Sequence, residues 1–87
     1  MSKMNERAGN LKRALLLELA HVPAGYLEPE KSLRAVVRLC VSPEPEEAEV
    51  DAQLARLEAD RLAVCVVDAF GVKRWKATAA GRAALQD

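Results

Sequence analysis

The stretch "KRWKAT" at residues 73–78 places three cations, Lys73, Arg74 and Lys76, around the only tryptophan of the chain, Trp75. Lysine and arginine side chains gathered in this way could neutralise the phosphates of a nucleic-acid backbone. The same charges could instead form the outer face of a strand and hinder edge-to-edge pairing of sheets. Trp75 is expected to be a core residue rather than a platform for stacked bases, because little else in the chain fills a comparable volume.

Side chains with catalytic or metal-binding chemistry are few and scattered. Cys40 and Cys65 lie 25 residues apart, with no Cys-x-x-Cys motif and no pair of histidines nearby. Both cysteines fall in apolar runs and are expected to be buried, reduced thiols. His21 is the only histidine and is expected at a helix end. A Gly-rich phosphate loop and an acid–base pair are also missing, so the sequence predicts no enzyme, no cofactor and no metal site.

The chain has the size of one small domain, with residues 1–10 expected to be a flexible N-terminus and residues 11–87 a single domain. Hydrophobic residues make up 51% of the chain but aromatic residues only 3%, so the core is thin and a partner chain is expected to cover part of it. Net charge is zero, which argues mildly against a nucleic-acid partner, but residues 44–60 carry a net charge of −6. No secretory or membrane segment is visible, and a cytoplasmic location is expected.

Apolar residues at helical spacing predict two helices in the first half of the chain. The first begins near Leu11 and is apolar on more than one side, so it either lies at the centre of the domain or packs against another subunit. Pro23 and Gly25 end it, and a short extended segment follows at residues 26–27. The second helix has Pro29 in its first turn and one stripe facing the core, made of Leu33, Val36, Val37 and Cys40.

A third helix is predicted from the acidic segment "SPEPEE" at residues 42–47 to about residue 61. Ser42 or Glu44 could cap it, Pro43 or Pro45 could lie in its first turn, and the glutamates suit the positive end of the helix dipole. Its inward row is expected to consist of Val50, Leu54, Leu57 and either Arg61 or Leu62.

The pattern then changes to the alternation of a β-hairpin. Residues 62–68 and 73–78 are the expected strands, with a Gly-containing turn at 69–72. Trp75 and Ala77 share the buried face, and Arg74, Lys76 and Thr78 share the other. Thr78 is placed to cap a terminal helix at 79–85, in which Gly81 permits close backbone approach.

This order of elements, α-β-α-α-β-β-α, is mainly helical with a small antiparallel sheet. "VDAQLARLEADRLAV" (50–64) resembles the third helix and following strand of winged helix-turn-helix proteins. "RWKATAAGRAAL" (74–85) resembles the second strand of their wing and the Thr-x-x-Gly-Arg helix start of bacterial regulators of this superfamily. A further similarity is to the small winged-helix proteins of Mu-like phages and prophages.

The resemblance implies that the third helix enters the major groove of double-stranded DNA while the wing contacts its backbone. Gln53 and Arg56 would then contact bases or phosphates, and Lys73, Arg74 and Lys76 would neutralise phosphates. Gln53 and Arg56 could also belong to an ordinary solvated helix face. Four acids in the first half of the helix would oppose DNA, namely Glu46, Glu47, Glu49 and Asp51.

Two functions therefore stay open. One is a non-enzymatic DNA-binding module of the transcription-regulator type. The other is a protein-interaction or assembly domain that uses its acidic third helix to bind a basic partner. In either case a homodimer through the first and last helices is expected.

Overall fold

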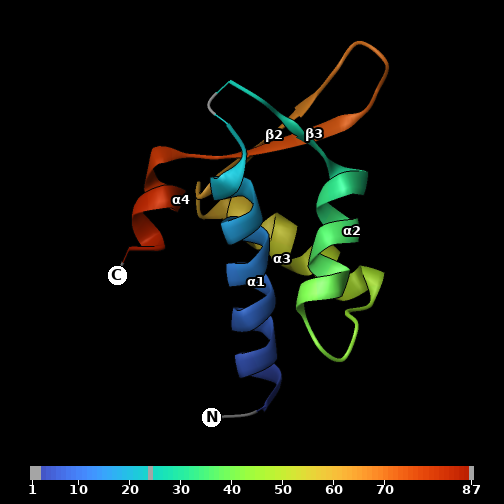
Figure 1. The fold of residues 1–87 in the computed structure, drawn as a ribbon, viewed down its shortest axis with the longest axis vertical. Helices are drawn as coiled ribbons and strands as arrows, with labels where there is room; N and C mark the ends of the chain where they lie inside the picture. The colour runs from blue at the N-terminus through green and yellow to red at the C-terminus, as the bar shows by residue number, and fades with distance from the viewer. Residues whose placement is uncertain (1–2, 24, 87) are drawn as a thin grey trace.

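The computed structural model describes residues 3–23 and 25–86, which form four helices and one three-stranded antiparallel sheet (Figure 1). The order is the predicted α-β-α-α-β-β-α, so the expected fold class is confirmed. The elements are α1 (Lys3–His21), β1 (Glu28–Pro29), α2 (Glu30–Cys40), α3 (Glu47–Ala59), β2 (Ala63–Val67), β3 (Lys73–Ala77) and α4 (Ala79–Ala84).

Helix α1 is the centre of the molecule and packs against α2, α3, α4 and strand β3. Its buried residues are Leu11, Leu15, Leu16 and Leu19. The helix begins at Lys3, well before the predicted start near Leu11, because Arg7 makes a tertiary ion pair with Glu49 of α3. The predicted flexibility of residues 1–10 stays a prediction, and residues 1 and 2 lie outside the described part of the chain.

Helix α2 buries Leu33 and Val37, whereas Val36 is half-buried. The prediction that Cys40 lies in the core is wrong: it is exposed, because it belongs to the last turn of α2, beyond the packed region. Cys65 is half-buried. Two boundaries also differ, since Pro29 is the N-cap of α2 and the short extended segment is β1 rather than residues 26–27.

Helix α3 turns Val50, Leu54 and Leu57 inward, as predicted. Its cap is neither Ser42 nor Glu44 but Glu46, whose side chain accepts from the backbone of Glu49 while the Glu49 carboxylate accepts from the Glu46 N–H. Consequently, Pro43 and Pro45 both precede the first turn. The helix ends at Ala59, and Arg61 is exposed at a φ of 61°, which places the N–H of Leu62 2.9 Å from the Leu57 carbonyl.

The sheet has the order β1-β3-β2, so β3 lies in the middle and β2 at an edge. Trp75 and Ala77 are buried, as predicted, and the Trp75 indole N–H donates to Glu30 at 2.9 Å. Thr78 caps α4 by accepting from the Gly81 N–H at 3.0 Å. A Cβ on Gly81 would come within 2.0 Å of the Leu62 carbonyl oxygen, so the expected close approach is present.

Candidate nucleic-acid interface

The outward face of α3 is covered by alanine. Because Val50, Leu54 and Leu57 point to the core, helical periodicity turns positions 48, 52, 55 and 59 away from it. The alanines at these four positions are all exposed: Ala48, Ala52, Ala55 and Ala59. Short side chains let another molecule come close to the helix backbone, so this row is the smoothest exposed surface of α3.

One flank of α3 faces α1 and is tied to it by ion pairs. Arg7 of α1 pairs with Glu49 at 2.6 Å, and Lys12 of α1 pairs with Asp60 at 3.4 Å. Gln53 lies on this flank and is half-buried. Arg56 lies further out, with 68% of its side chain exposed, and pairs with Asp60 at 3.2 Å.

The opposite flank of α3 borders a hollow of about 330 Å³ that is shared with α2 and β3. Lys73 is exposed at the β3 side of this hollow, and Asp51 and Glu58 line it from α3. Arg34 of α2 reaches into the same region and pairs with both Glu30 and Asp51. The hollow is therefore lined by three carboxylates and two cations, and it is not a basic cleft.

The outer face of the hairpin is less cationic than the sequence suggests. Arg74 donates to Asp68 at 3.0 Å, and Asp68 also accepts the N–H groups of Phe70 at 2.8 Å and Val72 at 3.0 Å. The hydrogen bond from the Val72 N–H, followed by that from Arg74, lowers the pKa of Asp68. Asp68 thus shapes the turn and neutralises Arg74 at the same time.

The five predicted contact residues do not form one patch. Arg56 and Lys73 lie on opposite flanks of the alanine row of α3. Gln53 is nearer to α1, and Arg74 is paired with Asp68. Lys76 points to the other face of β3, where it lines a hollow with Tyr26 and Arg82.

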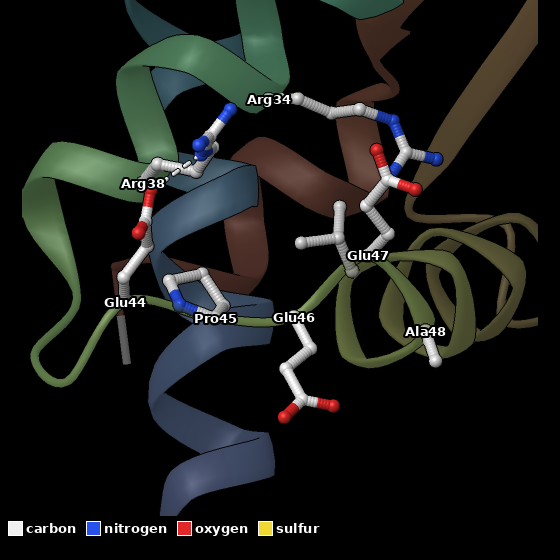
Figure 2. Close-up of a pocket in the computed structure, with 8 residues that line it drawn as sticks. Arg34, Arg38, Glu44, Pro45, Glu46, Glu47 and Ala48 are labelled. Atoms are coloured by element: carbon white, nitrogen blue, oxygen red, sulfur yellow. Dashed lines mark hydrogen bonds and ion pairs between the residues drawn. The ribbon is translucent and has the colours of Figure 1, made fainter.

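The start of α3 is surrounded by charges of both signs (Figure 2). A hollow of about 580 Å³ lies between α2 and this helix end, and its charged lining residues are Arg34, Arg38, Glu44, Glu46 and Glu47. Arg38 pairs with Glu44 at 2.7 Å, and the carboxylate of Glu47 extends toward Arg34 in Figure 2. Glutamates outnumber arginines here, so this end of α3 does not favour a phosphate group.

Three features of this region are not predicted from the sequence. Phe70 at the hairpin tip is 92% exposed, although aromatic residues usually lie in cores. The sequence pattern predicts Asp68 only as the end of a strand, yet an aspartate before a Gly-containing turn commonly accepts backbone N–H groups, which is a local signal for its role. Arg34 could not have been found, because its partner Asp51 lies on another helix.

Within residues 3–23 and 25–86, no group of three or more His, Cys, Asp or Glu side chains could hold a metal ion. The helices in the described part of the chain are all too short or too polar to cross a membrane.

The comparison with solved structures connects this architecture to a group of regulators. A transcriptional regulator of the MarR family from Silicibacter pomeroyi is similar to this chain with a TM-score of 0.67 and 25% sequence identity, over 95% of this chain. The chain has a winged-helix fold. In that fold, α2 and α3 form the helix-turn-helix and β2 with β3 forms the wing.

This winged-helix chain spans 59% of the length of that regulator. No protein-family model matches the chain, and no curated protein shows significant similarity to it. The predicted likeness to winged-helix proteins of Mu-like phages stays a prediction.

Proposed function

We propose that this chain is a non-enzymatic module of the transcription-regulator type that binds duplex DNA with α3 and the wing. One observation carries the proposal: on a fold similar to a transcriptional regulator, the outward face of α3 is an uncovered row of four alanines. An α-helix with a narrow outer face fits the major groove, and alanine methyl groups can contact the methyl group of thymine.

Two exposed cations border this row and supply the contacts to phosphate. Arg56 stands on the flank next to α1, and Lys73 stands on the flank next to the wing. We assign direct contact to these two residues, because a duplex lying along the alanines would pass between them. Three residues would contribute less. Gln53 is half-buried, Arg74 is paired with Asp68, and Lys76 lies on the far face of β3.

Acidic residues set the expected strength of binding. Glu47, Asp51 and Glu58 are exposed on α3 and would approach the phosphates. Each like-charge contact is unfavourable, so binding should be weak and should depend on few released counterions. Two neutralised phosphates correspond to a slope of about −2 in a plot of log affinity against log salt concentration.

A second candidate function is the binding of a basic protein segment by α3. The observation that favours it is that Arg56 and Arg74 are each held by a carboxylate, whereas Glu47 and Glu58 are exposed on α3. The exposed carboxylates of α3 would repel DNA but attract a lysine-rich segment, and the alanine row would let that segment come close to the helix.

Fluorescence anisotropy of a labelled random-sequence duplex tests the DNA proposal. We expect binding at about 50 mM salt that falls by about tenfold toward 200 mM, as a slope of about −2 implies. The variants Lys73→Gln and Lys76→Gln form a matched pair, because both residues are exposed on β3 but point to opposite faces. Lys73→Gln should lower the affinity and Lys76→Gln should leave it nearly unchanged.

The opposite outcomes are equally informative. Absence of duplex binding even at low salt would reject the DNA proposal. If a labelled lysine decapeptide then binds, and the variant Glu58→Gln weakens that binding, the second candidate is the better description. If DNA binds but Lys76→Gln weakens it more than Lys73→Gln, the duplex lies on the other face of the wing.

A further inference from the structure

A hollow of about 190 Å³ lies where the end of α1, the loop before β1, strand β3 and helix α4 meet (Figure 1). Its apolar lining includes Leu19 and Ala77, which belong to the core of the fold. Its polar lining comes from Tyr26, Lys76 and Arg82. A hollow that combines core side chains with a few polar groups has the make-up of a site for a small molecule.

The charged groups that line this hollow are all positive. Lys76 and Arg82 line it, and no aspartate or glutamate of the described chain does. Both cations are exposed, and neither makes an ion pair with the described residues. The two hollows beside α3 differ in this respect, because carboxylates line each of them. Two like charges around one small hollow repel each other, so an anion between them is favoured.

Arg82 of α4 is held at this hollow by the end of α1. Its Nη1 donates to the carbonyl oxygen of Ala20 at 2.8 Å, and its Nη2 donates to that of Val22 at 3.5 Å. Both acceptors are neutral, so the guanidinium group keeps its full charge. An arginine has more N–H donors than these two bonds use, and the remaining donors are free to bind an anion.

The backbone that carries the other two polar residues is also ordered. The N–H of Tyr26 donates to the Pro23 carbonyl at 3.1 Å, and Gly25 between them has a φ of 87°, a conformation that favours glycine. Lys76 belongs to the central strand of the sheet, where it is paired with Val64. Three donor side chains therefore reach the hollow from three fixed segments, and little backbone has to be ordered when a ligand binds.

The volume and the charge of the hollow restrict the ligand. One water molecule takes up about 30 Å³ of the liquid, so the hollow has room for roughly six waters or for a ligand of that size. A phosphate monoester carries a charge of about −1.5 to −2 at pH 7, which balances the two cations more completely than the single charge of a carboxylate or of a phosphate diester.

We propose that this hollow binds the phosphate group of a small phosphorylated molecule. Lys76 and Arg82 are the charged ligands of the phosphate oxygens, and the hydroxyl group of Tyr26 is a further donor. The proposal is independent of DNA binding, because neither the alanine row of α3 nor Lys73 lines the hollow.

An NMR titration of the isotope-labelled full chain tests the site at constant ionic strength. The two probes are methyl phosphate, a compact monoester, and dimethyl phosphate, a diester with the single charge of a DNA backbone phosphate. We expect methyl phosphate to shift the backbone amide signals of residues 25, 26, 76, 77 and 82 and to reach saturation. Dimethyl phosphate should bind at least about tenfold more weakly, because it balances only one of the two cations.

Two lysines of β3 provide a matched pair of variants for the same titration. Lys76→Gln should weaken the binding of methyl phosphate by about tenfold, since a hydrogen bond to a charged group is lost. Lys73→Gln should leave it unchanged, because Lys73 is equally exposed but points to the other face of the strand. Arg82 is less suitable for replacement, since its side chain also connects α4 to the end of α1. The amide spectrum of each variant shows whether it is folded.

Four results would each overturn the proposal. They are shifts that do not saturate, shifts confined to other residues, equal affinity for the two probes, and a folded Lys76→Gln variant that binds methyl phosphate like the original chain. If Lys76→Gln weakens duplex binding but not methyl phosphate binding, the hollow contacts the DNA backbone, and the proposal is wrong. Failure of the chain to bind DNA would leave the expected results of this titration unchanged.

Discussion

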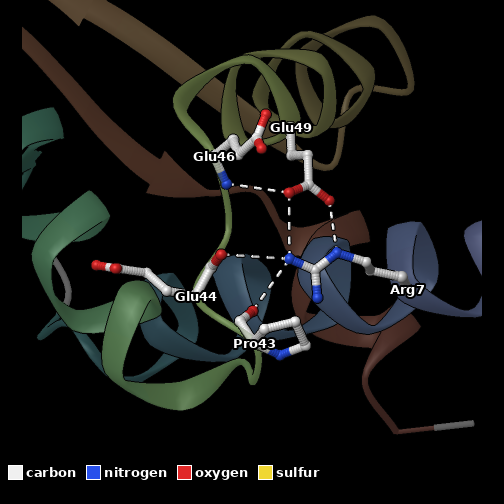
Figure 3. Close-up of polar contacts among 5 residues, drawn as sticks. All are labelled: Arg7, Pro43, Glu44, Glu46 and Glu49. Carbon is white, nitrogen blue, oxygen red and sulfur yellow. Dashed lines mark hydrogen bonds and ion pairs between the residues drawn. The ribbon is translucent and has the colours of Figure 1, made fainter.

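Arg7 of α1 holds Glu49 of α3 with two hydrogen bonds, from Nε to Oε2 at 2.6 Å and from Nη2 to Oε1 at 3.1 Å (Figure 3). The same Nη2 donates to the carbonyl oxygens of Pro43 at 3.0 Å and Glu44 at 3.4 Å. Glu49 in turn accepts the N–H of Glu46, the cap of α3. One guanidinium group therefore connects the central helix, the loop before α3 and the first turn of α3.

Replacing Glu49 should show this connection as a change in stability with pH. The hydrogen bonds from Arg7, and then that from the Glu46 N–H, lower the pKa of Glu49 to about 2. The carboxylate therefore stabilises the fold above about pH 4.5, and this contribution is lost as the pH falls toward 2. We expect Glu49→Gln to lower the free energy of unfolding at pH 7 and to differ less from the original chain in acid.

The measurement is urea unfolding at pH 7 and at about pH 2, followed by circular dichroism. Glu47→Gln is the control, because Glu47 lies in the same first turn but is exposed and has no contact with Arg7 among the described hydrogen bonds. Equal stability of the original chain and Glu49→Gln at pH 7 would show that the ion pair is only a surface contact.

Two glycines in helices should respond to alanine with opposite signs. A Cβ on Gly81 would lie 2.0 Å from the Leu62 carbonyl oxygen, whereas one on Gly9 meets nothing within 4 Å. Gly81→Ala must therefore displace backbone and should cost about 1–3 kcal/mol. Gly9→Ala lies in α1 and should stabilise by about 0.5–1 kcal/mol through its helix propensity. Thermal melts of both variants make the comparison, and a stable Gly81→Ala would mean that α4 does not pack where the structure shows it.

The elements of the fold could be predicted because their signals are local. The stripe Val50, Leu54, Leu57 determines which face of α3 is buried, and the alternation that buries Trp75 and Ala77 determines the face of the hairpin. The roles of Thr78 and Gly81 can be predicted for the same reason. A helix cap and a close backbone approach each require a particular residue type at one position.

The parts that the sequence did not reveal depend on contacts between distant residues. Helix α1 starts at Lys3 and therefore includes Arg7, whose partner Glu49 is 42 residues away. The distribution of cations over the candidate interface is another case. Arg56 and Arg74 are both basic in the sequence, but folding leaves Arg56 68% exposed beside Asp60, whereas Arg74 is only 33% exposed and is held by Asp68.

The ion pair between Asp68 and Arg74 provides a variant that reports which face of the wing contacts DNA. Asp68→Asn keeps an oxygen to accept the N–H groups of Phe70 and Val72, but it removes the charge that holds Arg74. Arg74 shares its face of β3 with Lys76, so the released guanidinium should bind one more phosphate and make the salt slope steeper by about 0.9 if DNA contacts that face, and should leave binding nearly unchanged if DNA lies on the Lys73 face. The double variant Asp68→Asn with Arg74→Gln should lose this gain. If the double variant binds DNA as tightly as Asp68→Asn alone, Arg74 is not the source of the effect.

Glu28 of β1 predicts a second pH dependence, opposite in direction to that of Glu49. It is only 6% exposed, and its Oε1 makes no hydrogen bond with the described residues. Burial, and then the neighbouring carboxyl of Glu18, raises the pKa of Glu28 to about 7. The folded chain thus keeps a proton that the unfolded chain releases near pH 4.5, so the stability from this group is complete below about pH 4.5 and is lost as the pH rises through 7.

Glu28→Gln carries a neutral side chain of the same shape and should remove this dependence. We expect its melting temperature to exceed that of the original chain at about pH 8 and to approach it at about pH 5. Glu58→Gln, exposed on α3, is the control for losing one carboxylate. The measurement is the melting temperature between about pH 5 and pH 8. If it changes with pH in the same way for the original chain and for Glu28→Gln, then Glu28 titrates like a solvated carboxyl and holds no buried proton beside Glu18.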